Sequence, residues 1–212
     1  MPTAVLLGDS IFDNAAYVGG APDVVRQLAP KLPPGWKAEL LAVDGAVMAG
    51  VPGQLRRLPG DAGLLVVSAG GNDALGYSGI LGQPATSMAE AVGRLAEIRT
   101  RFRRDYAAML DAVTATGVPT AVCTIYDARY PDEPRRTLVP AALSLLNDGI
   151  TREAFRRNLP LVDLRLICDR DEDYANPIEP SAIGGEKIST AIAALAASLG
   201  ALPKGRSAVF AR

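Results

Sequence analysis

The 212-residue sequence contains no histidine. Imidazole is the usual general base for a serine nucleophile and a common protein ligand of zinc, so its absence excludes the ordinary serine–histidine pair and the usual histidine-containing zinc sites. Only two cysteines are present, Cys123 and Cys168. A disulfide framework and a four-cysteine metal site are therefore excluded as well.

Long apolar runs and an excess of one charge are also missing. No run is long enough to span a bilayer, and Met1-Pro2 leads directly into an apolar segment without a signal sequence. We therefore expect a cytoplasmic protein without a membrane span. The 22 basic and 23 acidic residues nearly cancel, which argues against nucleic acid as a partner. No dinucleotide fingerprint or P-loop occurs, so we expect no cofactor, and the sequence does not indicate an oligomeric state.

Short apolar runs alternate with helical patterns along the whole chain. Continuous runs of this kind fit strands that are buried on both faces, and their alternation with helices predicts a parallel sheet. We therefore predict a single α/β domain over residues 1–212, a three-layer α/β/α sandwich with a flavodoxin-like, parallel five-stranded sheet. The expected strands are Ala4–Leu7, Ala38–Val43, Leu64–Ser68, Thr120–Ile125 and Leu161–Leu164.

The expected helices cover roughly residues 23–28, 88–113, 138–155 and 185–199. Ser87 with Glu90 forms a capping-box pattern at the start of the second helix. Residues 76–84 and 130–136 are expected to be loops that wall a site, because long loops in compact domains are often functional. The pattern leaves open whether the tail, residues 203–212, is extended or packs on a neighbour.

Three polar motifs each follow one of the expected strands. Gly8-Asp9-Ser10 follows the first strand, Asp44-Gly45 follows the second, and Gly70-Gly71-Asn72-Asp73 follows the third. Because the carboxyl ends of parallel strands meet at one edge of a sheet, the three loops should converge. A serine at such an edge is a candidate nucleophile, which needs a nearby base to take its proton.

On these three motifs and their order, the chain resembles the SGNH hydrolase superfamily, also called GDSL hydrolases, over nearly its whole length. The resemblance implies that Ser10 is the nucleophile of an ester hydrolase. It also implies that the backbone N–H groups of Ser10 and Gly45, with the side-chain amide of Asn72, form the oxyanion hole. Loss of one such donor typically costs about 10²–10³-fold in rate.

The last block of the superfamily pattern is altered in this chain. The pattern has an aspartate and, three residues later, the catalytic histidine, followed by proline. Here Asn176 stands at the aspartate position and Glu179 at the histidine position, while Pro180 and the following Gly184-Gly185 resemble the pattern. Both groups that handle the proton are therefore replaced together.

Three interpretations of this replacement stay open. In the first, Glu179 is the general base, oriented by the amide of Asn176 and helped by a pKa that burial raises, or it positions a water that attacks directly. In the second, the protein is a non-catalytic ligand-binding pseudo-hydrolase on the same pocket. In the third, Asp44, Asp73 and Glu179 bind a magnesium or calcium ion that activates water.

We take the first interpretation as the expected function, a serine hydrolase that cleaves small-molecule esters of small acyl groups. The expected catalytic residues are Ser10, Gly45, Asn72, Glu179 and Asn176. Two other residues are weaker candidates. Lys187 lies within the last helical pattern and is expected to be solvated, and Asp173 is an alternative replacement for the missing acid.

Overall fold

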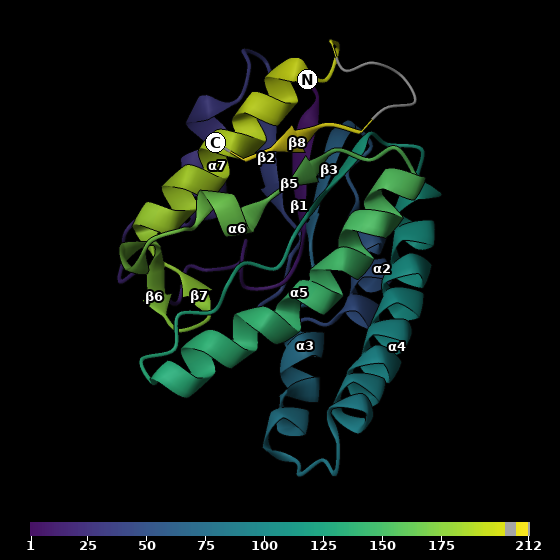
Figure 1. The fold of residues 1–212 in the computed structure, drawn as a ribbon. Coiled ribbons are helices and arrows are strands. Elements are labelled where there is room, and N and C mark those ends of the chain that lie inside the picture. The colour runs from purple at the N-terminus through teal and green to yellow at the C-terminus, as the bar shows by residue number, and fades with distance from the viewer. Residues whose placement is uncertain (202–206, 212) are drawn as a thin grey trace.

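The computed structural model describes residues 1–201 and 207–211, and its centre is a six-stranded sheet in which every pairing is parallel (Figure 1). The strand order is β2-β1-β3-β4-β5-β8, and its first five members follow the predicted flavodoxin-like order. The strands are β1 (Thr3–Gly8), β2 (Lys37–Leu40), β3 (Ala62–Ser68), β4 (Thr120–Cys123), β5 (Leu161–Val162) and β8 (Val209–Phe210).

The prediction of five strands was wrong by one. Strand β8 lies in the tail and pairs with β5, with Leu161 opposite Val209 and Val162 opposite Phe210. A strand of two residues has no periodicity that could distinguish it from a loop, so only its pairing partner reveals it. Residues 202–206 and 212 lie outside the described part of the chain.

Helices cover both faces of the sheet, as predicted. One layer holds α1 (Val24–Leu28), α6 (Leu164–Ile167) and α7 (Ala182–Ser198), and the other holds α2 (Val51–Gln54), α4 (Met88–Thr114) and α5 (Glu133–Arg156). Successive residues of a strand point to opposite faces. In β1, Ala4 and Leu6 therefore pack in the α7 layer, and Val5 and Leu7 pack in the α4 layer.

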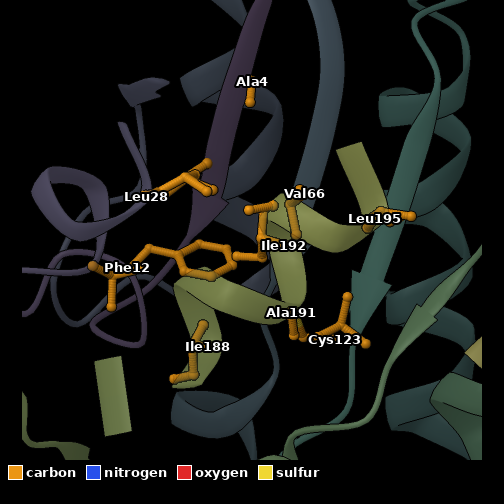
Figure 2. Close-up of a cluster of buried hydrophobic side chains, with 14 of the residues drawn as sticks. Ala4, Phe12, Leu28, Val66, Cys123, Ile188, Ala191, Ile192 and Leu195 are labelled. Atoms are coloured by element: carbon orange, nitrogen blue, oxygen red, sulfur yellow. The ribbon is translucent and has the colours of Figure 1, made fainter. Parts of the chain in front are cut away.

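Helix α7 shows how the sequence pattern produces this packing. Ile188, Ile192 and Leu195 recur at steps of four and three, form one stripe and are fully buried. Figure 2 shows Ile192 beside Val66 of the sheet and the ring of Phe12 pointing toward Ile192, and all of these side chains belong to one buried cluster. Burial of each such side chain contributes about 1.5–3 kcal/mol.

The helices that follow the strands extend beyond the carboxyl edge of the sheet. The short helix α3 (Gly71–Tyr77), the first half of α4 and the first half of α5 reach past this edge together (Figure 1). None of the helices in the described residues combines the length and the apolar composition needed to cross a membrane.

Two of these helical segments were predicted as loops. Residues 76–84 contain the end of α3 and a 3₁₀ helix at Ser78–Gly82, and residues 130–136 contain the start of α5 at Glu133. Asp132 caps α5 by accepting the N–H of Arg135, and a proline occupies the first turn. Proline is compatible with the first turn of a helix, so its presence there does not mark a loop.

Candidate active site

The first strand ends in a turn that only glycine can make. Gly8 has a φ of +121°, and a Cβ atom there would lie 1.6 Å from the carbonyl oxygen of Ser68. The buried side chain of Gln54 binds both backbone groups of Gly8, accepting the N–H at 2.8 Å and donating to the carbonyl at 2.7 Å. This turn places Ser10 at the carboxyl edge of the sheet. Gln54 lies outside the three motifs, and sequence reasoning missed it.

The structure brings Ser10 and Glu179 together across 169 positions of sequence. Glu179 begins β7 (Glu179–Pro180), which forms an antiparallel hairpin with β6 (Tyr174–Asn176) beside the main sheet. The Ser10 hydroxyl donates a hydrogen bond of 3.1 Å to Oε1 of Glu179. Glu179 is only 7% exposed, and among the described residues its Oε2 atom has no hydrogen-bond partner. A buried carboxylate therefore accepts the hydrogen bond of the Ser10 hydroxyl.

Asn176 is near the site but does not contact the carboxylate of Glu179. It is exposed, and its Oδ1 accepts the backbone N–H groups of Ile178 and Glu179, each at 3.0 Å. Asparagine favours such short-range bonds to the backbone of a turn. The expected orientation of Glu179 by an amide-to-carboxylate bond is therefore corrected, because Asn176 shapes the turn before Glu179 instead.

Asn14 joins the segment after Ser10 to the hairpin and was also missed by sequence reasoning. It is fully buried, donates to the carbonyl of Pro180 at 3.3 Å and accepts the N–H of Val24 at 3.0 Å. The hydroxyl of Tyr126 holds the hairpin from another side by donating to the carbonyl of Ile178 at 2.7 Å. These bonds keep Glu179 beside Ser10, and no motif distinguishes Asn14 or Tyr126 in the sequence.

The three motif loops converge as predicted. Gly45 has a φ of +76° and is exposed, and within the described chain neither its N–H nor that of Ser10 donates to a protein acceptor. Asn72 lies in the first turn of α3, where its side-chain amide donates to the carbonyl of Ala46 at 2.9 Å. This bond ties the third loop to the second and leaves one amide hydrogen of Asn72 for another acceptor.

An apolar cavity of about 120 Å³ adjoins Ser10. Asp9, Ser10, Asn72 and Glu179 form its polar end, and the remainder extends between the three helices that project beyond the sheet. Its walls are almost entirely hydrophobic, a common composition for sites that bind small organic molecules. The helical side chains in these walls include Leu75, Leu81, Leu95, Ile98, Val139 and Leu146.

Residues 6–186 match the sequence profile of the GDSL-like lipase/acylhydrolase family. The chain belongs to this family. Among curated protein sequences, none matches the chain. The solved structures of similar fold include esterases and lipases. Their sequence identities to this chain are so low that the likeness shows a shared fold alone.

Three of these GDSL-like structures illustrate the likeness. An extracellular lipase from Streptomyces rimosus has a TM-score of 0.65 and 18% identity, covering 92% of this chain and 100% of that one. A phospholipase A1 from Streptomyces albidoflavus has a TM-score of 0.65 and 18% identity, with coverages of 89% and 96%. A carbohydrate acetylesterase from Sinorhizobium meliloti has a TM-score of 0.62 and 14% identity, with coverages of 94% and 100%.

Carboxylates dominate the electrostatics of this GDSL-type site. Burial is the largest of the effects that together raise the pKa of Asp9 to about 7; the bond from the N–H of Ile11 opposes it, and the nearby carboxylates of Glu179 and Asp73 add to it. Burial also raises the pKa of Glu179, with a further contribution from the charge of Asp44. Burial raises the pKa of Asp73 in the same direction. These groups therefore hold protons to higher pH than ordinary carboxylates do.

The alternative of a cation site is not supported by the geometry. In residues 1–201 and 207–211, no group of three or more acidic, cysteine or histidine side chains lies close enough together to hold a metal ion. Asp44, Asp73 and Glu179 therefore do not assemble into the ligand set considered from the sequence.

The remaining two candidates pair with each other away from Ser10. The carboxylate of Asp173 is completely buried and accepts a bond of 2.7 Å from the ammonium of Lys187. Lys187 is partly solvated, with 33% of its side chain exposed, and its ammonium also joins α7 to the segment before β6. Asp173 is committed to this ion pair and to the N–H of Arg170, so it does not replace the missing acid.

Proposed function

We propose that this protein is a serine ester hydrolase in which the carboxylate of Glu179 takes the role of imidazole. The observation that supports this proposal most directly is the 3.1 Å hydrogen bond from the Ser10 hydroxyl to Oε1 of Glu179. Nucleophile and base in an activated pair lie within about 2.6–3.2 Å of each other. The backbone N–H groups of Ser10 and Gly45 and the amide of Asn72 supply the oxyanion donors.

The raised pKa of Glu179 is what makes a carboxylate usable as this base. An ordinary glutamate near pKa 4.3 is a poor acceptor for an alcohol proton, and general-base catalysis works best when the pKa is near the working pH. Burial and the charge of Asp44 move the pKa of Glu179 in the required direction. Asp9 titrates close by, so a pH–rate profile would report apparent values for the coupled group.

The reaction proceeds in two halves with balanced proton transfers. Ser10 Oγ attacks the ester carbonyl carbon while its proton passes to Glu179, and the proton then goes to the departing alcohol as the carbon–oxygen bond breaks. Water attacks the acyl-Ser10 ester, gives a proton to Glu179, and releases the acid as the proton returns to Ser10.

The acyl group of the ester occupies the apolar cavity. About 10–15 Å³ of such space accommodates one water-sized group, so a cavity of about 120 Å³ has room for roughly ten of them. This size suits an acyl chain of medium length better than the small acyl groups expected from the sequence. The helices α3, α4 and α5, which form the walls, therefore set the preference for chain length.

A fluorophosphonate probe tests the proposal, because it labels only an activated serine. We expect labelling of the wild type at Ser10, none in Ser10→Ala, and a labelling rate lower by about 10²–10⁴-fold in Glu179→Gln. Glu172→Gln is the matched control, since Glu172 is an exposed carboxylate in an ion pair with Arg170 and should leave labelling unchanged. A folded wild-type protein that is not labelled would favour the non-catalytic binding alternative.

A further inference from the structure

Asp9 lines the polar end of the cavity, but the proposed reaction gives its side chain no role. Of the other polar residues there, Ser10 attacks the ester, Glu179 takes the proton and Asn72 donates to the oxyanion. Asp9 is only 3% exposed, and the cavity is otherwise walled almost entirely by hydrophobic side chains. A polar group buried in such surroundings is costly unless it has a hydrogen-bond partner, so the bonds of Asp9 indicate what the cavity accepts.

The turn at the end of β1 fixes the backbone and one carboxyl oxygen of Asp9. Its N–H donates to the carbonyl of Ser68 at 3.1 Å, and its own carbonyl accepts the N–H groups of Phe12 and Asp13. Oδ1 accepts the N–H of Ile11 at 3.2 Å. Oδ2 has no hydrogen-bond partner in any other residue of the described chain, yet it is not one of the fully enclosed polar atoms. The carboxyl group therefore presents Oδ2, held in a fixed place, to the cavity.

Oδ2 lies at the start of the wall that α3 contributes to the cavity. A Cβ atom added at Gly71, the first residue of α3, would lie 3.7 Å from Oδ2, and Gly71 lines the cavity together with Asp9. An acyl chain that begins at Ser10 and continues between the projecting helices therefore passes this oxygen with its first carbons. Groups farther along the chain meet only the hydrophobic walls.

The surroundings of Asp9 favour a neutral ligand group. Burial is the largest of the effects that raise the pKa of Asp9 to about 7, so below this pH the carboxyl is uncharged. The titratable groups that interact with it are acidic or buried and neutral: Glu179, Asp73, Tyr106, Cys123 and Tyr126. An ammonium group in this cavity would lose its hydration and would gain a full ion pair only with an ionised carboxylate. A neutral hydrogen-bonding group avoids this cost.

We propose that Asp9 is a specificity-determining residue that binds a hydroxyl group on carbon 2 or 3 of the acyl chain. The inference rests on the proposed hydrolase function and adds the chemical class of the acyl half, a hydroxyacyl ester. A hydroxyl both donates and accepts, so it matches either state of the carboxyl. It accepts the proton of a neutral Asp9, which lies on Oδ2 because Oδ1 accepts the N–H of Ile11, and it donates to Oδ2 when Asp9 is ionised.

An ester without this hydroxyl is at a disadvantage in the same cavity. Its apolar chain displaces water from Oδ2 and supplies no hydrogen bond in return, and leaving a buried polar group unsatisfied is costly. Sites that bind a hydroxyl of the substrate discriminate against analogues that lack it for this reason. One hydrogen bond to a partly satisfied carboxyl group should change kcat/KM by about tenfold.

Three esters with the same alcohol and the same number of acyl carbons test the inference. They are the methyl esters of hexanoic, 2-hydroxyhexanoic and 3-hydroxyhexanoic acid, with each enantiomer of the hydroxy acids measured separately. Dividing kcat/KM by the rate of hydrolysis of each ester in hydroxide removes the effect of the hydroxyl on intrinsic reactivity. We expect at least one hydroxylated ester to exceed the hexanoate about tenfold at pH 6 in the wild type. Values equal to or below that of the hexanoate for all of them would overturn the inference and leave the proposed function standing.

Variants of Asp9 show whether this residue binds the hydroxyl. The preference should disappear in Asp9→Leu, which has no polar atom, and it should persist in Asp9→Asn, whose amide both donates and accepts. Glu172→Gln, at an exposed position, should keep the wild-type preference. A preference that survives in Asp9→Leu would overturn the inference, as would a larger preference for methyl 3-aminohexanoate, which would mean that the cavity selects a cation. The comparison of esters in the wild type decides the matter by itself if Asp9→Leu does not fold.

Binding to Ser10→Ala gives a readout that does not require turnover. We expect isothermal titration calorimetry to show the preferred hydroxylated ester binding about tenfold more tightly than methyl hexanoate, and the difference to vanish when Asp9→Leu is added. Equal affinities of Ser10→Ala for the two esters would overturn the hydroxyl subsite. Absence of fluorophosphonate labelling and of cleavage of every ester by the wild type would instead overturn the proposed hydrolase function, so the two failures are distinguishable.

Discussion

Replacing Asp9 by asparagine should change how the stability of the protein depends on pH. Asp9 is 3% exposed, and burial raises the pKa of its carboxyl from 3.8 to about 7. Asparagine has the same shape and keeps an oxygen that can accept the N–H of Ile11, which Asp9 Oδ1 accepts at 3.2 Å. The substitution therefore removes the titration while preserving the local bond.

The sign and size of the effect follow from proton linkage. Between pH 4 and pH 7 folded Asp9 keeps its proton, whereas the unfolded chain loses it, so the free energy of unfolding falls as pH rises through this window. The difference between a pKa of 3.8 in the unfolded chain and a pKa of about 7 in the folded protein changes the free energy of unfolding by about 4 kcal/mol, at about 1.4 kcal/mol per pKa unit. Above pH 7 the wild type bears this cost in full, and Asp9→Asn does not.

Urea denaturation at several pH values from 4 to 8 measures the difference. We expect Asp9→Asn and the wild type to have similar free energies of unfolding near pH 4, and the variant to be more stable at pH 8 by up to about 4 kcal/mol. Glu172→Gln, in which the replaced carboxylate is exposed, should show a small difference that is nearly constant with pH. Parallel stability curves for Asp9→Asn and the wild type would refute the reasoning, because they would mean that folding does not alter the titration of Asp9.

Two further substitutions test the turn and the cavity. Gly8→Ala should prevent folding, as measured by circular dichroism, because the added Cβ would lie 1.6 Å from a backbone oxygen. Gly20→Ala is the control, since Gly20 also has a positive φ, +88°, but no atom lies within 4 Å of the position of its Cβ. We expect this control to lower the free energy of unfolding by only about 1–2 kcal/mol. A folded Gly8→Ala protein of normal stability would contradict this account. Ala142→Trp should reduce kcat/KM for octanoyl esters at least tenfold more than for acetyl esters, because Ala142 lines the apolar cavity. Ser144→Trp is the control, since Ser144 lies on the exposed face of the same helix, and it should leave kcat/KM for both esters unchanged. An unchanged chain-length profile in Ala142→Trp would place the acyl group elsewhere.

The sheet and the turn before Ser10 were predictable from sequence because their signals are local. The apolar runs around Val5, Val66 and Val122 identify strands buried on both faces, and the flavodoxin-like order of the first five strands is confirmed. The motif Gly8-Asp9-Ser10 indicates a turn at its own position in the sequence, since Gly8 adopts a backbone conformation that other residues avoid. Strand β8 escaped prediction because its two residues carry no period.

The walls of the cavity were less predictable because helical segments were mistaken for loops. Glycines in residues 76–84 and prolines in residues 130–136 suggested irregular chain, yet the end of α3 and a 3₁₀ helix occupy most of the first segment and the start of α5 lies in the second. Met88 is 80% exposed and Val92 is 58% exposed, so the first turns of α4 belong to the projecting helices and not to the core. The helical periodicity of apolar residues predicts an apolar stripe on a helix, but it does not indicate whether that stripe faces the core, a cavity or solvent.

The sequence by itself determined the positions of the first five strands, the turn before Ser10 and the absence of any imidazole, because each of these is written in one short segment or in the composition. Only the tertiary structure decided that Glu179 meets the Ser10 hydroxyl and that Asn176 bonds to backbone instead of to that carboxylate. These are relations between segments far apart in the chain. Distance along the sequence carries no information about which side chains share a buried, weakly solvated space, and it is that shared space that sets their charges and their chemistry.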